Sequence, residues 1–328
     1  MLRWLGVCLA LVFGIVALSA ATLILGNTRY SLPVILQVLS GRHIAGASFA
    51  VGVLRFPRMV GGIFAGVAFG MAGSTFQTML RNPLASPDII GITSSSSAAA
   101  VFCILVLRLS KGPVSLSAVG AGLLSTAIIY FLSRRRGFSS ARLILIGIGM
   151  NALGNSMISY FLLLSAQYEI PAALQWLSGS LNGIQLIELL PLGVVLVIFV
   201  PIILVLGPRL QMLELGDESA AGLGVRADMT RLGLILASVG LLSFATAAAG
   251  PIAFIAFLSG PIARMTAGKV FPVELPAGLT GAVLVLAADL LGQHAFGTRY
   301  PVGVITGIVG APYLLILLVR QYRTGALS

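Results

Sequence analysis

Apolar runs long enough to cross a membrane recur from one end of this chain to the other, separated by short polar breaks. A helix of about 20 apolar residues crosses the roughly 30 Å hydrocarbon core of a bilayer. Lipid offers no hydrogen bonds to a bare backbone, so a chain with many such runs must satisfy its polar groups within helices. The sequence therefore predicts an all-α, polytopic membrane protein.

Composition excludes the ordinary soluble enzyme. The 328 residues are 58% hydrophobic and 9% charged, whereas soluble domains are about 25% charged. The formal net charge of +11 would suggest nucleic acid in a soluble protein. Here the basic residues fall in the breaks between apolar runs, where they orient spans in the membrane. Lipid is therefore the expected environment, and no nucleic-acid partner is predicted.

Pro, Gly and charged residues divide the chain into ten predicted spans within a single transmembrane domain, residues 1–328. The expected spans are 4–26, 58–80, 89–108, 113–132, 141–165, 188–207, 231–250, 252–267, 274–292 and 302–320. The first run is longer than a signal-peptide core, so we expect it to be retained as a span. Residues 168–187 are too polar to span and are predicted to lie at an interface.

The basic residues predict the orientation. If both termini are cytoplasmic, seven of the 20 Lys and Arg residues face outward and thirteen inward, which satisfies the positive-inside rule. The outward set is Arg29, Arg42, Arg55, Arg58, Arg108, Lys111 and Arg299. Four of these seven fall within residues 27–58, an excess that needs a cause.

Two predicted spans carry stripes of small residues at four-residue spacing. Such stripes let membrane helices pack closely, so we expect tight helix contacts rather than a ligand site. The two stripes are Gly62, Gly66, Gly70 and Ser74, and Gly303, Gly307 and Ala311.

The longest polar interruption on the predicted inner side is residues 207–231, which we call the knob. Its sequence predicts two short amphipathic helices separated by glycines. A loop of this length with its own helical pattern is usually functional, and an ordinary solvated loop is the alternative. A projecting helical segment suits docking to a cytoplasmic partner.

The chain contains no phosphate-binding loop, no catalytic triad and no Cys or His set with metal-ligand spacing. We therefore predict no enzymatic activity, no cofactor and no metal site. Asp289 is an intramembrane acid, and such acids are functional candidates by default. Bracing a helix near the outer interface is an equally open alternative for it.

Several segments resemble the FecCD family, the permease subunits of ABC importers for cobalamin, haem and ferric siderophores. The motifs are "RFPR" (55–58), "AGSTFQTMLRNPLASPDIIGI" (72–92), "LELGDESAAGLGV" (213–225), "GPIAFIAFLSGPIAR" (250–264) and "YPVGVITGIVGAPYLLILL" (300–318). They cover nearly the whole chain in the family's order. Their residues resemble the ferric-siderophore branch more than the cobalamin branch.

The resemblance implies a ferric-siderophore importer in the bacterial cytoplasmic membrane, with a cobalamin or haem importer as alternative. The implied partners are a second permease subunit, identical or not, two cytoplasmic ABC ATPases and an extracytoplasmic substrate-binding protein. The residues implied to form the ATPase-coupling helices are Leu213, Glu214, Leu215, Gly216, Asp217, Glu218, Ala221, Leu223 and Gly224. Arg55 and Arg58 would dock the binding protein. Arg299 replaces a common family Glu and would extend that surface.

The resemblance also implies that the "NPLA" loop helps to close the inner mouth of the pathway. Pro83 and Pro87 fix φ and forbid helix continuation, so they would hold Asn82 and Leu84 rigidly, with Asp88 as a helix cap. Four polar residues are candidate pathway liners: Gln77, Asn151, Asn155 and Ser159. Helix–helix hydrogen bonding is the alternative for the last three. A function of another class, a secondary transporter that moves protons through Asp289, also stays open.

Overall fold

The computed structural model describes residues 2–86, 90–133, 139–268 and 271–323, and within these ranges it contains helices and no strand. The elements are α1 (Leu2–Ile24), α2 (Leu32–Leu39), the π-helix η1 (Ser48–Arg55), α3 (Phe56–Met79), α4 (Ile92–Leu105), α5 (Lys111–Ser133), α6 (Ser140–Leu164), α7 (Ile170–Leu177), α8 (Leu186–Glu214), α9 (Asp217–Gly222), α10 (Ala227–Ala249), α11 (Ile255–Ala267), α12 (Glu274–His294) and α13 (Val302–Arg323).

The all-α prediction is confirmed, and a helix lies at each of the ten predicted positions. Seven helical stretches in the described ranges are long and apolar enough to cross a membrane. Two of the helices at the other three positions, α4 with 14 residues and α11 with 13, are shorter than that standard, and the third, α13, has 22 residues. Residues 168–187 hold the short helix α7, as expected for a segment that does not span.

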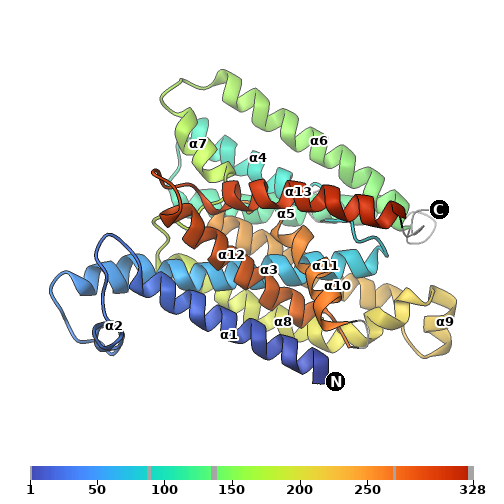
Figure 1. Ribbon diagram of the computed structural model, residues 1–328. Helices are drawn as coiled ribbons and strands as arrows, with labels where there is room; N and C mark the ends of the chain where they lie inside the picture. The colour runs from blue at the N-terminus through green and yellow to red at the C-terminus, as the bar shows by residue number, and fades with distance from the viewer. Residues whose placement is uncertain (1, 87–89, 134–138, 269–270, 324–328) are drawn as a thin grey trace.

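The helices run roughly parallel, with their ends gathered at two poles (Figure 1). The start of α1, the end of α13 and α9 lie at one pole, and α2 and α7 lie at the other. We call these the knob pole and the far pole. The arrangement places both ends of the described chain on the same side of the bundle.

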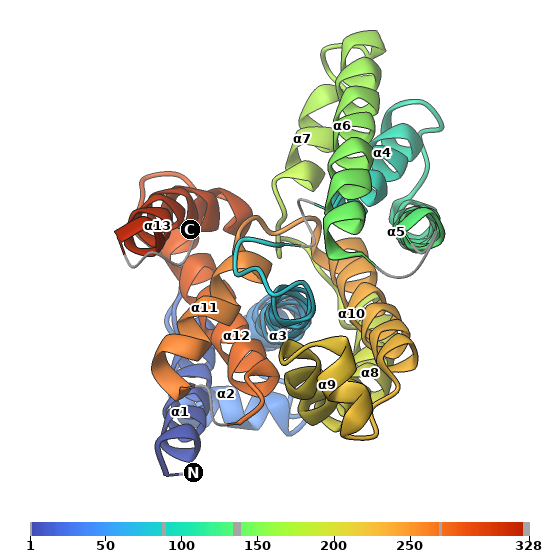
Figure 2. The same ribbon diagram turned by 90° about the vertical axis from the view of Figure 1, so that its right-hand side faces the viewer.

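Helix α3 is the centre of the fold. Figure 2 shows it surrounded by α1, α8, α10, α11 and α12, while α4–α7 form a group beside α10. The predicted stripe explains this position: a Cβ on Gly66 would lie 2.5 Å from the Ala282 Cα of α12, and one on Gly70 2.3 Å from the Ala277 carbonyl. These separations leave no room for a side chain, so the close-packing prediction is confirmed for α3.

The same prediction holds only in part for the stripe on α13. A Cβ on Gly307 would meet nothing within 4 Å, and Gly303 packs against the Ser178 carbonyl of a loop instead of another helix. Ala311 is exposed. Within the described chain, Gly303 is therefore the closely packed member of the α13 stripe, whereas Gly307 and Ala311 have open space around them.

Helix α8 joins the two poles without a break. It contains Pro191, Pro201 and Pro208 and ends at Glu214, so the helix continues seven residues past the predicted span, which ends at residue 207. The first of the two short helices predicted in the knob is thus the last turns of α8, and the second is α9. Each proline lacks the N–H that would bond back along the helix, but the surrounding turns preserve the helical path.

Candidate functional site

The knob is a small folded unit with its own apolar centre. Leu213, Ala220 and Val225 are buried together where the end of α8, α9 and the start of α10 meet. Leu215, Leu223 and Met229 are each at least 60% exposed. The apolar residues of the knob therefore divide into a set that packs within the chain and a set that is exposed.

Asp217 connects α9 to α10 and to the turn that follows α3. Its carboxylate accepts two hydrogen bonds from Arg231 of α10, one of them at 2.8 Å, and lies 3.9 Å from the guanidinium of Arg81. The hydrogen bonds from Arg231 and the charges of both arginines hold the pKa of Asp217 below its usual range, against a smaller opposing effect of burial. Asp217 therefore acts within the chain, a role the sequence did not suggest.

Two further contacts attach the root of the knob. Arg81 donates to the Leu213 carbonyl at the end of α8. Arg264 of α11 lies 3.8 Å from Glu214 and donates to Thr78 of α3. The knob is thus bonded to α3, α10 and α11, and two of these contacts involve residues at or next to the end of α3.

The "NPLA" loop begins directly after that end. Arg81 has φ +51°, a left-handed conformation that a side chain makes costly. Asn82 then organises the turn: its Oδ1 accepts from the Leu84 N–H at 2.9 Å, and its carbonyl accepts from the Ala85 N–H at 3.0 Å. The chain reverses tightly here, as the prolines predict. Pro87 and Asp88 lie outside the described residues.

The predicted pathway residues fall into two groups. Gln77 is fully buried and donates to the Phe257 carbonyl of α11 at 2.9 Å, so it joins two helices. On α6, Asn155 and Ser159 are exposed, and Asn155 donates to Asn151 at 3.3 Å within the same helix. Among the described residues the α6 stripe forms no hydrogen bond to another helix, which leaves its polar face open.

At the far pole, Asp289 forms a buried ion pair. Arg58 donates to both carboxylate oxygens at 2.7 Å, and Gln293 donates at 2.8 Å. Arg58 also donates to Asn182 in the loop before α8. The side chains of Arg58 and Asp289 are 13% and 2% exposed. This network joins α3, α12 and the 178–185 loop, which favours the bracing alternative for Asp289.

The other two predicted docking residues differ from each other. Arg55 bonds the carbonyls of Leu23, Ile24 and Thr28, so its guanidinium covers the end of α1. Arg299 is exposed and donates to the Asn27 side chain at 2.7 Å. Sequence reasoning overlooked Arg29 and Arg42 as docking candidates, although both are exposed in the same basic segment.

Comparison with known proteins places these features in a family. Residues 11–320 match the FecCD transport family. The ferric enterobactin transport system permease protein of Escherichia coli (strain K12) is 33% identical over 322 residues, which is 98% of each chain. The achromobactin transport system permease protein of Dickeya dadantii (strain 3937) is 35% identical over 94% of this chain and 89% of that one. The chain belongs to the FecCD transport family.

Solved structures give the same result for the fold. A chain from a metal-chelate type ABC transporter in an inward-facing conformation is similar with a TM-score of 0.86 and 25% identity. The match covers 96% of this chain and 99% of that one. The family includes relatives of more than one substrate class, since the vitamin B12 import system permease protein of Vibrio cholerae is 32% identical over 82% of both chains.

Proposed function

We propose that this chain is the membrane-spanning permease subunit of an ABC importer for a ferric siderophore. The observation that carries the proposal is the 98% mutual coverage with a ferric enterobactin permease at 33% identity. An achromobactin permease and a ferric citrate permease are similarly close. Cobalamin or haem is the alternative cargo, supported by the vitamin B12 relative.

The proposal gives the chain a defined place in the bacterial cytoplasmic membrane. All ten predicted positions would then span, with both termini and the knob pole cytoplasmic, and residues 1–328 would form one permease domain. Supporting this orientation, the start of α1 and α9 lie at one pole (Figure 1). The predicted outward residues Arg58, Lys111 and Arg299 all make contacts near the far pole.

Energy would enter through the knob. In this proposal two cytoplasmic ATPases contact the exposed face of Leu215, Leu223 and Met229, together with the polar edge of α9. A displacement of α9 would be transmitted to the end of α3 through the ion pair between Asp217 and Arg81. The "NPLA" loop starts at the next residue, Asn82. The short path from knob to loop supports Asn82, Pro83 and Leu84 as a gate whose position follows nucleotide binding.

The binding protein would dock at the far pole on exposed charge. Arg299 keeps its predicted docking role, and Arg29 and Arg42 join it because both are exposed. Arg55 and Arg58 then serve docking indirectly, by fixing α1 and α3 in place beneath that surface. Acidic residues on the partner would be attracted at a distance and screened by salt.

The second permease subunit would cover the open side of the bundle. Helices α6 and α13 lie on the same side in Figure 2 and carry exposed apolar residues, for example Leu163 at 84% and Ile308 at 64%. The polar α6 stripe of Asn151, Asn155 and Ser159 would face a shared pathway. Gln77 would support the pathway from α3, through its hydrogen bond to α11.

Uptake in reconstituted vesicles tests the function. The permease, its ATPases and its binding protein are combined, and accumulation of iron-55 siderophore is compared with that of labelled cobalamin and haem. We expect ATP-dependent uptake of the iron chelate that persists when the membrane potential and pH gradient are collapsed.

The same experiment separates the alternatives. Uptake of cobalamin or haem in preference to the chelate would reassign the cargo. Accumulation by the permease alone, driven by a proton gradient, would refute the proposal in favour of a secondary transporter. The Asp289 geometry argues against that result, because among the described residues its bonded neighbours are Arg58 and Gln293, which form no relay of acids.

A further inference from the structure

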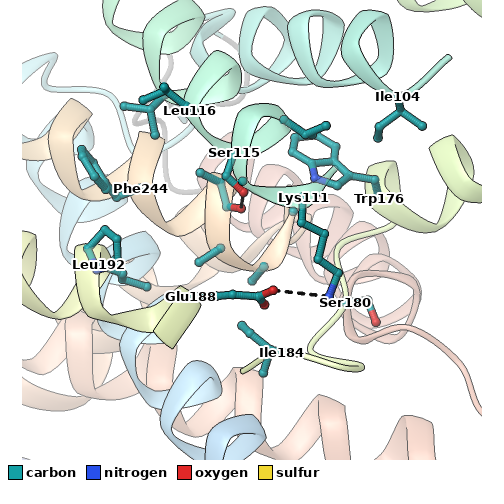
Figure 3. A pocket seen from close by; sticks show the side chains of 18 of the residues that line it. Ile104, Lys111, Ser115, Leu116, Trp176, Ser180, Ile184, Glu188, Leu192 and Phe244 are labelled. Carbon is teal, nitrogen blue, oxygen red and sulfur yellow. Dashed lines mark hydrogen bonds and ion pairs between the residues drawn. The ribbon is translucent and has the colours of Figure 1, made fainter. Parts of the chain in front are cut away.

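A cavity of about 570 Å³ lies at the far pole, between α4, α5, α7, α8 and α10. Most of its wall is apolar: Figure 3 shows Leu192 and Phe244 on one side and Trp176 and Ile104 on the other. Its volume is within the range of about 300–1,000 Å³ that small-molecule sites occupy. None of the predicted pathway residues lines it, so it is separate from the proposed route of the cargo.

The cavity adjoins the surface that the helices present to lipid. Leu116 lines it and is 74% exposed, on a helix long and apolar enough to span. Trp176 is partly buried and packs on the cluster that joins α4 to α5. An indole in this position, at the end of several spans, is typical of the boundary between hydrocarbon and headgroups.

One cation and one anion stand together among the lining residues. Lys111 Nζ lies 3.6 Å from a Glu188 carboxylate oxygen, longer than a direct hydrogen bond. Lys111 also donates to the Gly183 carbonyl at 3.1 Å, and Glu188 accepts from the Gln185 N–H at 3.2 Å, which fixes both groups in place. Figure 3 shows the pair on the side of the cavity next to Ser180 and Ile184.

We propose that this cavity binds one phospholipid whose headgroup carries both a phosphate and a primary ammonium, with an acyl chain against the apolar wall. The headgroup phosphate pairs with Lys111, and the headgroup ammonium donates to Glu188. Charge complementarity carries the assignment: an adjacent cation and anion match a zwitterion, whereas an anionic lipid would bring its charge against Glu188 without compensation. A primary ammonium is further favoured over a quaternary one because it has N–H donors.

The two tryptophans of the chain allow a direct test. Trp4 lies near Phe271 at the knob pole, so a W4F chain reports from Trp176 alone. This chain is placed in phosphatidylcholine nanodiscs with increasing fractions of phospholipid brominated on its acyl chains, because bromine quenches indole fluorescence on contact. We expect brominated phosphatidylethanolamine to reach half-maximal quenching at about fivefold lower mole fraction than brominated phosphatidylglycerol.

Three variants in the W4F background make the test specific. Glu188→Gln should abolish the preference for the ethanolamine headgroup, and Lys111→Gln should weaken quenching by both lipids. Glu169→Gln is the matched control, because Glu169 pairs with Arg108 at 2.7 Å and does not line the cavity. Equal quenching by the two brominated lipids in the W4F chain, or no response to either cavity variant, overturns the proposal.

A second measurement does not depend on fluorescence or on W4F. Native mass spectrometry of the detergent-purified wild-type chain should retain one phosphatidylethanolamine, and this adduct should be lost in both Glu188→Gln and Lys111→Gln. Retention of phosphatidylglycerol instead, or of a second copy of the chain with no lipid, contradicts the proposal.

Discussion

Asp217 pairs with Arg231 of α10 and with Arg81, which lies two residues past the end of α3, and its negative charge holds α9 in place. The bond to Arg231 is bidentate and Arg231 is largely buried, whereas Asp217 itself is about half exposed. Solvent screens an exposed partner, so the pair is worth less than a buried one. Its importance lies in position, since it fixes the knob relative to α3 and α10.

Acid should release the knob before it unfolds the bundle. Because the folded pKa of Asp217 is lowered, its contribution is complete above the ordinary value near about 4 and is lost as pH falls through the lower folded value. Hydrogen–deuterium exchange of residues 213–230 should therefore rise as pH falls below about 4, after correction for the intrinsic pH dependence of exchange. Asp217→Asn should show the faster exchange already at neutral pH, while Glu218→Gln, an exposed neighbour, should match wild type.

Glu274 is the most deeply buried carboxylate of the knob pole, 1% exposed at the start of α12. Neither of its oxygens has a hydrogen-bond partner among the described residues. The start of a helix favours an acid by about 0.3–1 kcal/mol, less than the several kcal/mol that an unpaired buried charge costs. We expect Glu274→Gln to raise the thermal unfolding midpoint in detergent by about 2 °C or more, with Glu218→Gln, at an exposed acid in α9, as control. A lower midpoint would mean that the carboxylate is needed.

At the scale of the element, close packing of α3 depends on the absence of side chains. Gly66 and Gly70 contact backbone atoms of α12, which cannot move aside as a flexible side chain can. Gly307 of α13 is also a glycine in a stripe with four-residue spacing, but it has open space around it. The two helices therefore give a matched pair of substitutions.

Gly70→Ala should destabilise the fold strongly, and Gly307→Ala should not. Overpacking in a dense interior costs about 1–3 kcal/mol or more, whereas Ala in an open helical position gains up to about 1 kcal/mol over Gly. Thermal unfolding of the two purified variants checks this directly. If both lose stability equally, the α13 face has a partner of its own in the purified protein.

The elements themselves were largely predictable because lipid demands long apolar helices. Four features were not. The end of α8 at Glu214 was missed since Pro208 normally stops a helix, yet the chain continues through it. The helical turn before α3 and the shortness of α4 depend on neighbouring segments, which no local pattern reports. The α13 stripe has the same kind of residues at the same spacing as the α3 stripe. The two stripes differ in the atoms that surround them, which the sequence does not show.

At the scale of the whole molecule, long-range partners decide which charges are available. Arg58 finds Asp289 more than two hundred residues away, and Arg55 finds the end of α1. Sequence alone located the basic cluster and both arginines, but it could not show that they point inward. A short helix, α9, forms within the predicted knob, while the internal role of Asp217 depended on Arg231 and Arg81 meeting it in space.

This distinction predicts different consequences of charge reversal at the far pole. Arg42→Glu and Arg299→Glu should weaken capture of the binding protein, with a smaller effect at high salt, and should leave thermal stability unchanged. Arg58→Glu should instead cost about 3–5 kcal/mol of stability, because it leaves Asp289 buried without its partner. Surface-immobilised binding assays and thermal unfolding, run on all three variants, check both expectations. Salt-independent loss in Arg299→Glu would contradict the docking role.

Helix α8 carries Glu188 near its start, beside the far-pole cavity, and ends at Glu214 in the knob. Three prolines interrupt its ladder of backbone hydrogen bonds. At each proline a carbonyl lacks its usual N–H donor, so a bend there breaks no backbone hydrogen bond at that carbonyl. Flexure should concentrate at these points while the intervening turns stay rigid. The helix can therefore bend at these three points, so its end in the knob can tilt while its end beside the far-pole cavity keeps its position.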